Sequence, residues 1–421
     1  MDKIRIIGGN VLDGRIRVKG AKNAVLPLMA AALLTEEEVV LQDVPNLSDI
    51  RTMTKVLEHL GAQVSFEEDT LRIKADNICC FEAPYELVSK MRASFWVLGP
   101  LVGRFRKAKV SLPGGCAIGT RPVDRHLYAM EQLGVKIEIE NGYVLASGRP
   151  QGNQIYFQIK TVGGTMNALM ASVLANGTTE IVNAATEPEV TDLAECLVKM
   201  GADINGIGTS RLVINGVETL HGVTHKVVPD RIEAATYAIA AGITDGKIYI
   251  ENARLDLIED VAFSLKRMGL EIAESDNCLM VKAPQYRLKA TDVATEEFPG
   301  FPTDVQAQIM ALMCLAEGTS TVTENIFENR FMHVQELVRM GADIRLQGSR
   351  TAIIKGVKEL SGAQVMASDL RASAALVLAG LAAKGETIIN RIYHLDRGYD
   401  HMEEKLQLCG ANIERIKETD E

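Results

Sequence analysis

The sequence of 421 residues predicts a mixed α/β fold made of six repeats of about 70 residues, packed as two lobes of three repeats each. The first observation is a recurring signature in which an apolar residue and a glycine precede a strand-like run. Its glycines are Gly61, Gly134, Gly201, Gly269, Gly341 and Gly410. They lie 67 to 73 residues apart, and such regular spacing indicates internal repeats.

The second observation is that the same segments recur in order between these glycines. Apolar, Ala-rich segments predict buried helices, as at 24–34, 166–175 and 372–383. Short β-branched segments after them predict strands, as at 39–41, 179–182, 248–250 and 387–389. An amphipathic helix then ends at the repeat glycine, which acts as its C-cap, and two alternating strands follow, as at 64–66 and 71–73.

The third observation is that the repeats divide at Pro229, with three before it and three after it. We therefore expect a first lobe of residues 21–229, and a second lobe of residues 1–20 together with 230–421. The N-terminal strand would complete the C-terminal half. Two lobes joined by two crossings, near Gly20 and Pro229, would form a cleft that opens and closes.

The composition excludes several classes of partner. The net charge is −10 without a basic block, so we expect no nucleic-acid polymer as a partner. No apolar run reaches the roughly 18 residues of a membrane helix, and no secretory signal is recognised, so we expect no membrane partner. Neither the seven cysteines nor the histidines at 126, 333 and 394 show the spacing of metal ligands, so we expect no metal site. A reduced, cytoplasmic protein without metal or cofactor is expected.

A glycine-rich loop carries the most reactive candidate, Cys116. Gly114, Gly115 and Gly119 make residues 112–126 permissive, which predicts a mobile loop. Arg121, Arg125 and His126 follow closely in sequence, and nearby cations favour a thiolate. The alternative is a surface loop with an unreactive cysteine.

Cations at equivalent positions of the repeats predict an anionic substrate. Lys22 and Arg371 lie at expected starts of inner helices, whereas Arg121, Arg330 and Arg397 lie in equivalent loops. Helix N-termini favour anions, and residues 161–165, with two glycines and two hydroxyls at a helix start, suit a phosphate. Gathered guanidinium groups indicate a substrate with carboxylate and phosphate groups, although each arginine alone fits a solvated ion pair.

The acidic residues at helix starts have two interpretations. Asp230, Asp304 and Asp369 occupy positions where an N-cap aspartate belongs, and a cap is the simpler interpretation of each. A proton-accepting base is the other. Glu328 and Asp396 are expected to orient neighbouring arginines.

Taken together, several motifs resemble those of the UDP-N-acetylglucosamine enolpyruvyl transferases, in the EPSP synthase-like superfamily. They are Lys22-Asn23, the 113–126 loop, 300–304, 327–331, 369–371 and 396–399, and they span the chain. The resemblance implies a two-lobed inside-out α/β barrel. It also implies transfer of the enolpyruvyl group of phosphoenolpyruvate to the 3′-hydroxyl of UDP-N-acetylglucosamine, with release of phosphate, as the first step of peptidoglycan precursor synthesis.

The resemblance also implies roles for individual residues. Cys116 would protonate the methylene carbon and form covalent adducts, and Asp304 would be the base on the sugar hydroxyl. Phosphate would be held by Lys22, Arg121 and Arg397, and carboxylate by Arg371 and Arg397. The nucleotide sugar would contact Asn23, Arg92, Arg121, Pro122, Val123, Asp124, Arg125, Thr161, Val162, Gly163, Ile326 and Arg330.

Three positions depart from the family pattern, namely Thr161 in place of Ser, Gly164 in place of Ala, and Arg125 in place of Leu. Two other functions are alternatives to enolpyruvyl transfer to UDP-N-acetylglucosamine. An enolpyruvyl transferase acting on shikimate 3-phosphate should lack the cysteine loop. An inactive paralogue that binds the UDP-sugar as a regulator would not need to retain Cys116, Asp304 and the cations.

Overall fold

The computed structural model describes residues 2–89, 91–113 and 123–417, and these form two compact units. Unit 1 contains residues 2–19 and 229–417. Unit 2 contains the described residues between 20 and 228. Within the described residues, the chain passes from unit 1 to unit 2 after residue 19 and back after residue 228.

Each unit contains three four-stranded sheets of one design. In every sheet an edge strand is parallel to its neighbour and the other two pairs are antiparallel. The sheets of unit 2, in spatial order, are β14(Val223–Lys226)-β3(Val39–Gln42)-β5(Thr70–Lys74)-β4(Gln63–Glu67), β6(Glu82–Ala83)-β7(Lys107–Ser111)-β9(Tyr143–Ser147)-β8(Lys136–Glu140) and β10(Gln154–Tyr156)-β11(Thr178–Val182)-β13(Arg211–Asn215)-β12(Asp203–Asn205). Those of unit 1 are β2(Asp13–Arg17)-β15(Lys247–Glu251)-β17(Cys278–Lys282)-β16(Glu271–Ser275), β18(Val293–Ala294)-β19(Thr319–Thr323)-β21(Thr351–Lys355)-β20(Asp343–Gln347) and β22(Gln364–Met366)-β23(Glu386–Asn390)-β1(Lys3–Ile7)-β24(Asn412–Ile416).

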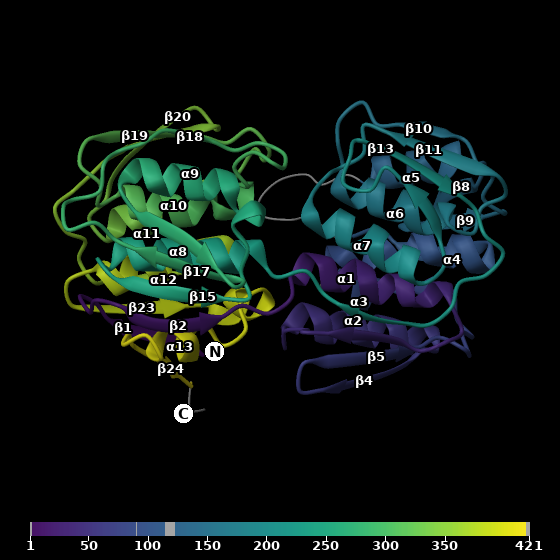
Figure 1. Cartoon of the computed structure of the whole chain (residues 1–421), viewed down its shortest axis with the longest axis horizontal. Helices are drawn as coiled ribbons and strands as arrows, with labels where there is room; N and C mark the ends of the chain where they lie inside the picture. The colour runs from purple at the N-terminus through teal and green to yellow at the C-terminus, as the bar shows by residue number, and fades with distance from the viewer. Residues whose placement is uncertain (1, 90, 114–122, 418–421) are drawn as a thin grey trace. The chain divides into compact units, whose positions relative to one another are not determined.

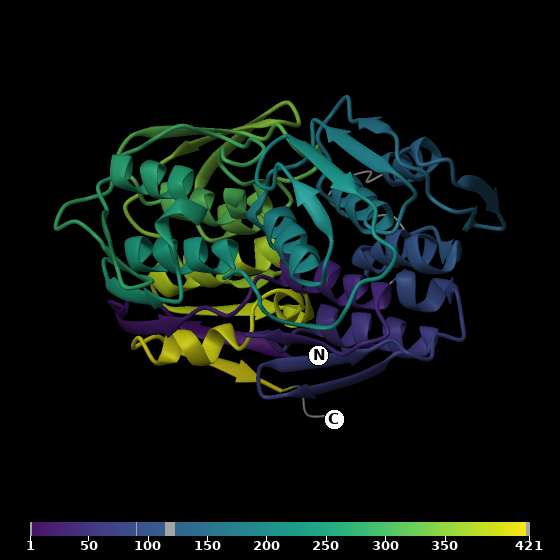
Figure 2. The same ribbon diagram turned by 45° about the vertical axis from the view of Figure 1, so that its right-hand side comes forward.

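The N-terminal strands belong to two different sheets of unit 1. β1 lies between β23 and β24, antiparallel to both, with Ile4 opposite Ile389 and Arg415. β2 is the parallel edge strand beside β15. Figures 1 and 2 show these purple strands among the green and yellow elements of the C-terminal half. The first residues of the chain therefore complete its fourth and sixth repeats.

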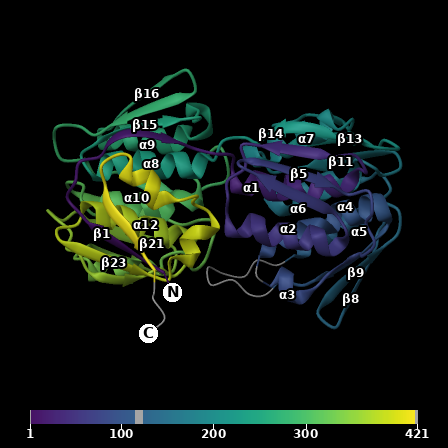
Figure 3. The same ribbon diagram turned by 90° about the horizontal axis from the view of Figure 1, so that it is seen from below.

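The inner helices are almost wholly buried. They are α1(Lys22–Ala31), α4(Leu98–Phe105) and α6(Val162–Ser172) in unit 2, and α8(Arg231–Ile243), α10(Gln306–Met313) and α12(Leu370–Ala382) in unit 1. In α8, every residue from Ile232 to Ile243 is buried. A helix that is apolar on all sides is stable only when covered, and many alanines let neighbouring helices approach closely. α8, α10 and α12 pack on one another (Figure 3).

The outer helices are amphipathic and end at the repeat glycines. They are α2(Ser48–Leu60), α5(Asp124–Gln132), α7(Pro188–Lys199), α9(Glu259–Met268), α11(Val334–Arg339) and α13(Met402–Gln407). All six repeat glycines have positive φ, for example 108° at Gly61 and 114° at Gly269. A side chain would be strained in this left-handed conformation, which explains why glycine recurs there. The expected mixed α/β fold of six repeats is confirmed.

The remaining helical segments refine the expected helix starts. α3(Tyr85–Val88), η1(Ala32–Leu34), η2(Arg92–Val97), η3(Leu255–Leu257), η4(Thr303–Val305) and η5(Ile392–Arg397) are short, and the η segments are 3₁₀ turns. Two inner helices begin with such a turn, because η2 leads directly into α4 and η4 into α10. The expected loop over 112–126 is wrong at its end, because Asp124, Arg125 and His126 form the first turn of α5.

Candidate functional site

Asp304 is clamped between two arginines in unit 1. Nη2 of Arg330 lies 2.7 Å from one carboxylate oxygen, and Nη2 of Arg371 lies 2.8 Å from the other. The side chains of Arg330 and Arg371 are 5% and 7% exposed, and that of Asp304 is 27% exposed. Three of the predicted site residues therefore meet at the start of α10, with one side open to solvent.

Asp304 is not the N-cap that its spacing suggested. It lies in η4, whose N-cap is Pro302, and its carboxylate bonds the two guanidinium groups instead of a helix N–H. The cap interpretation is correct for Asp230, which accepts from the N–H groups of Ile232 and Glu233. It is also correct for Asp369, which caps α12. The long-range arginines distinguish Asp304 from the other two.

The two arginines determine the charge of Asp304. Burial raises the pKa of its carboxyl, but the positive charges of Arg371 and Arg330 and their hydrogen bonds outweigh this effect and hold the pKa well below its usual range. The pKa of Arg371 is correspondingly raised: its burial opposes this, but Asp304 outweighs it. Asp304 is therefore ionised at neutral pH, and it is a weak proton acceptor while both guanidinium groups hold it.

Glu324 organises the loop that presents Arg330, and the sequence did not single it out. Its Oε1 accepts from the N–H groups of Ile326 and Phe327, at 2.9 and 3.0 Å. Its Oε2 accepts from the hydroxyl of Thr303 at 3.0 Å, which ties the loop to the turn that carries Asp304. Glu324 is fully buried at the end of β19, and a carboxylate after an alternating strand was the only sequence signal for it.

Asp396 pairs with an arginine that lies close to it in the fold but 19 residues away in sequence. Its carboxylate accepts from Nη1 and Nη2 of Arg415 in β24, at 3.1 and 2.5 Å. Arg397 ends η5 and lowers the pKa of the nearby, partly buried His394, for which burial is the larger cause. Glu328 forms no hydrogen bond or ion pair with the part of the chain that the structure describes, so its expected role stays a prediction.

In unit 2, Lys22 is paired with a carboxylate that the sequence did not single out. Lys22 is the first residue of α1, and its Nζ lies 2.8 Å from Oδ2 of Asp49 in the first turn of α2. The two side chains are 12% and 5% exposed. A mostly buried ion pair fixes the ammonium group more firmly than a solvated pair would. Asn23 follows Lys22 in the same helical turn.

The start of α6 offers backbone N–H groups, as the sequence predicted. The hydroxyl of Thr161 accepts from the N–H of Gly164 at 3.1 Å, so Thr161 is the N-cap and Val162 and Gly163 begin the helix. Arg125 donates to the carbonyl of Lys160, at 3.4 Å, just before this turn. Thr161, Val162, Gly163 and Arg125 are thus brought together.

His126 packs behind this turn as a neutral ring. Its Nδ1 lies 2.8 Å from Nδ2 of Asn167, which donates, so the ring proton resides on Nε2. A Cβ on Gly163 would lie 2.8 Å from that Nε2, which places the ring edge against the helix start. Burial, and to a smaller extent Arg92, lowers the pKa of His126 to about 3.

The departures at Thr161 and Gly164 fit each other sterically. A Cβ at position 164 would lie 2.5 Å from Cγ2 of Thr161, which is far inside van der Waals contact. Cγ2 is the methyl group by which threonine exceeds serine. The larger cap residue therefore occupies the space that an alanine at 164 would need.

Other features of the expected site are not tested. Cys116, Arg121 and Pro122 lie outside the described residues, so their expected roles stay predictions. Among the described residues, no group of three or more His, Cys, Asp and Glu side chains is placed to hold a metal ion. Nor is any helix of the described parts long and apolar enough to cross a membrane.

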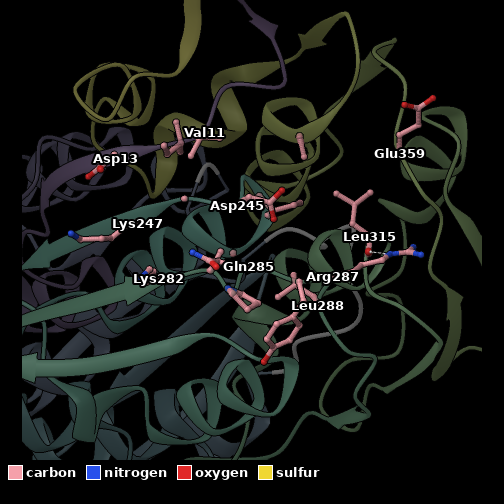
Figure 4. Close-up of a pocket in the computed structure, with 18 of the residues that line it drawn as sticks. Val11, Asp13, Asp245, Lys247, Lys282, Gln285, Arg287, Leu288, Leu315 and Glu359 are labelled. Atoms are coloured by element: carbon pink, nitrogen blue, oxygen red, sulfur yellow. Dashed lines mark hydrogen bonds between the residues drawn. The ribbon is translucent and has the colours of Figure 1, made fainter.

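Unit 1 also contains a cavity of about 770 Å³ (Figure 4). Its lining includes Ile243 and Ala382, the last residues of α8 and α12, and Leu315 just after α10. Asp304, Arg330 and Arg371 do not line it. Asp304 and Arg371 lie at the opposite, N-terminal ends of α10 and α12.

Comparison with known sequences identifies relatives along the whole chain. A family model described as EPSP synthase (3-phosphoshikimate 1-carboxyvinyltransferase) matches residues 6–406. The chain is 57% identical over 429 aligned positions to the UDP-N-acetylglucosamine 1-carboxyvinyltransferase of Paramagnetospirillum magneticum, with 99% of each chain covered. It is 56% identical to the protein of the same name from Granulibacter bethesdensis, with 99% of this chain and 100% of the relative covered.

Solved structures show the same fold. The enolpyruvyl transferase NikO from Streptomyces tendae superposes with a TM-score of 0.90 at 26% identity, over 99% of each chain. An EPSP synthase from Acinetobacter baumannii superposes with a TM-score of 0.77 at 17% identity, over 99% of this chain and 100% of the other. The resemblance found in the motifs is thereby confirmed.

Proposed function

The chain belongs to the EPSP synthase family, and from that membership we propose that it transfers the enolpyruvyl group of phosphoenolpyruvate to the 3′-hydroxyl of UDP-N-acetylglucosamine. The acceptor is proposed from the full-length relatives, whose names specify UDP-N-acetylglucosamine. The observation that carries the chemistry is the carboxylate of Asp304 held between Arg330 and Arg371. It combines a proton acceptor with two cations, as an anionic substrate with a reacting hydroxyl group requires.

In the proposed reaction the 3′-hydroxyl oxygen bonds to C2 of phosphoenolpyruvate and its proton passes to Asp304. Cys116 gives a proton to C3, which becomes a methyl group, and a tetrahedral ketal results. One C3 proton then returns to Cys116 while phosphate leaves C2 with the proton from Asp304. The products are the enolpyruvyl ether and phosphate, so atoms and charges balance.

The clamp on Asp304 explains how its basicity would depend on substrate. The carboxylate of phosphoenolpyruvate competes with Asp304 for Arg371, to which we assign carboxylate binding together with Arg397. Loss of one guanidinium contact frees a carboxylate oxygen and raises the pKa of Asp304 towards its usual value. The base would thus become effective only when substrate is bound.

The remaining assignments follow from charge and position. Lys22, positioned by Asp49, would bind the transferred phosphate together with Arg121 and Arg397. The N-terminal turn of α6 would bind the diphosphate, with its Thr161 cap, and Asn23, Arg92 and Ile326 would contact the sugar nucleotide. Pro122, Val123, Asp124 and Arg125 are proposed beside the uracil.

We assign the reaction to peptidoglycan precursor synthesis in the cytoplasm, where phosphoenolpyruvate is formed. Phosphoenolpyruvate and UDP-N-acetylglucosamine are the proposed partners, without a metal or other cofactor. Electrophilic epoxides such as fosfomycin are proposed to modify Cys116, because the thiol that donates the proton becomes a nucleophilic thiolate once it has lost that proton.

Phosphate release from phosphoenolpyruvate tests the proposal. The purified protein should release phosphate with UDP-N-acetylglucosamine and not with shikimate 3-phosphate, and a Cys116→Ala variant should lose the activity. Release with shikimate 3-phosphate alone would assign the other acceptor of the family. Tight binding of UDP-N-acetylglucosamine without any release would instead identify a regulatory paralogue.

A further inference from the structure

Behind Arg371 lies a buried polar cluster that the proposed reaction does not use. It consists of Thr236 in α8, Gln308 in α10 and Tyr399 just after η5, with exposed fractions of 0%, 0% and 2%. The hydroxyl of Tyr399 is 2.9 Å from Oγ1 of Thr236, 3.2 Å from Nε2 of Gln308 and 3.4 Å from Nη1 of Arg371. Side chains from α8, α10 and α12 thus meet at the hydroxyl group of Tyr399.

The direction of each hydrogen bond follows from the available protons. The hydroxyl of Thr236 donates to the carbonyl of Ile232 at 2.8 Å, so it can only accept from Tyr399. Tyr399 therefore donates to Thr236, and its oxygen lone pairs remain to accept from Gln308 and Arg371. The phenol is oriented as an acceptor facing the guanidinium group, whose Cζ lies 5.7 Å from the centre of the tyrosine ring.

Gln308 links the same phenol to the backbone of Asp304. Its Nε2 donates to the carbonyl of Asp304 at 2.8 Å, as well as to Tyr399. A flipped amide would place an oxygen against that carbonyl and the phenol, so the assignment is determined by its neighbours. The hydroxyl of Tyr399 therefore bonds Arg371 directly, and it is linked through Gln308 to the main chain of Asp304.

We propose that Tyr399, supported by Thr236 and Gln308, is a positioning residue that holds the Arg371 guanidinium group against Asp304. The expected effect on catalysis rests on the proposed function, whereas the expected position of the Arg371 guanidinium group does not. The other charged groups here are Arg330, which bonds Asp304, and Asp230, which interacts electrostatically with Arg371.

A Tyr399→Phe variant tests the proposal, because it removes the hydroxyl group and keeps the ring. Tyr237→Phe is the matched control: this tyrosine is also fully buried in unit 1, and its hydroxyl donates to Glu233 at 3.2 Å and forms no hydrogen bond with Arg371 or Asp304 among the described residues. We expect Tyr399→Phe to raise the KM for phosphoenolpyruvate about tenfold, as for loss of a hydrogen bond to a charged group. The KM for UDP-N-acetylglucosamine should stay within about twofold.

The acidic limb of the pH profile gives a second measurement. With Arg371 less firmly held, Asp304 loses part of the stabilisation of its charged form, so the limb should move to higher pH in Tyr399→Phe and not in Tyr237→Phe. Thr236→Val should produce a smaller change in the same direction. Combined with Tyr399→Phe it should add nothing, because Thr236 acts through the phenol.

A purely structural role would lower the melting temperature of both tyrosine variants and leave KM and pH profile unchanged, and this result would overturn the proposal. A crystal structure of Tyr399→Phe separates the inference from the proposed function. Displacement of Arg371 from Asp304 supports positioning even if the wild-type protein proves inactive with both acceptors. An unmoved guanidinium group would refute it whatever the activity.

Discussion

At the scale of single residues, sequence spacing located the candidate groups but did not assign their partners. Asp230, Asp304 and Asp369 share one position relative to an inner helix, and spacing alone favoured a helix cap for each of them. Only two of them cap a helix. Asp304 differs because Arg330 and Arg371, distant in sequence, approach it in the folded unit. Spacing cannot reveal such contacts, since they depend on how the repeats pack.

Asp304→Asn should abolish most activity and also destabilise unit 1. The amide cannot take a proton, so kcat should fall by about 10² or more. It also leaves two mostly buried guanidinium groups without their carboxylate, which should lower the free energy of unfolding by about 3 kcal/mol. Phosphate release and urea unfolding measure the two effects.

The matched control is Asp369→Asn, because asparagine is an equally good N-cap and the free energy of unfolding should change by less than about 0.5 kcal/mol. If Asp304→Asn kept near-normal turnover, Asp304 would not be the base. If its stability equalled that of Asp369→Asn, the clamp would carry little energy.

The pair Thr161 and Gly164 predicts strong coupling between two substitutions. Gly164→Ala places a Cβ against the Thr161 methyl group and should destabilise the protein by about 1–3 kcal/mol. Thr161→Ser removes that methyl group and keeps the cap, so the double variant should recover most of the loss. A double-mutant cycle in denaturant measures the coupling, and additive free energies would show that the methyl group is not the obstacle.

At the scale of elements, most helices and strands were predictable because the repeats present one pattern six times. The strands at 64–66 and 71–73 and the inner helices formed close to their predicted bounds. The first turn of α5 was missed because prolines and glycines precede it closely. Glu324 and Asp49 were missed because a single carboxylate beside apolar residues has no distinctive pattern.

Two buried histidines predict that the stability of the protein depends on pH. His126 in α5 and His333 before α11 are both buried, and burial is the main cause that lowers their pKa values to about 3 and about 4. Between those values and about 6.5 the unfolded chain binds protons that the native protein does not, so stability should fall as pH falls below about 6.5.

At pH 5 the lowered pKa of His126 should reduce the free energy of unfolding by about 2 kcal/mol relative to its value at neutral pH. His126→Asn keeps an acceptor near Asn167 and should flatten the pH dependence between pH 6.5 and 4. His59→Asn, at an exposed position, serves as the control. Denaturant unfolding at several pH values is the measurement. An unchanged slope in His126→Asn would show that the ring is already protonated in the folded state.

At the scale of the whole molecule, the first two strands of the chain lie in sheets formed mainly by its C-terminal half. The sequence predicted that residues 1–20 complete the C-terminal half, but it did not reveal that β1 and β2 enter two different sheets. Strand pairing over more than 380 residues depends on complementary edges rather than on any local signal, as between Ile4 and Ile389.

Unit 1 should therefore depend on the first strand of the chain, although most of its residues come much later. Ile6→Ala removes a fully buried side chain of β1 and should lower the stability of unit 1 by about 3 kcal/mol. Arg5→Ala is the control, because its ion pairs with Glu386 and Glu414 are exposed. Hydrogen exchange of Ile6→Ala should increase in peptides from 229–417 and remain unchanged in those from 20–113. Equal acceleration in both ranges would contradict the division into separate units.

The central claim is enolpyruvyl transfer by addition and elimination, and the product formed in D2O tests it most directly. In the proposed intermediate C3 carries three hydrogens, one of which comes from solvent through Cys116. Because the C3 methyl group of the intermediate rotates, any of its three hydrogens can leave during elimination, so part of the product retains the solvent hydrogen. Mass spectrometry and NMR of the product should show an enolpyruvyl ether of UDP-N-acetylglucosamine with deuterium in its vinyl group. Phosphate release without the ether, or an ether free of deuterium, would contradict the account.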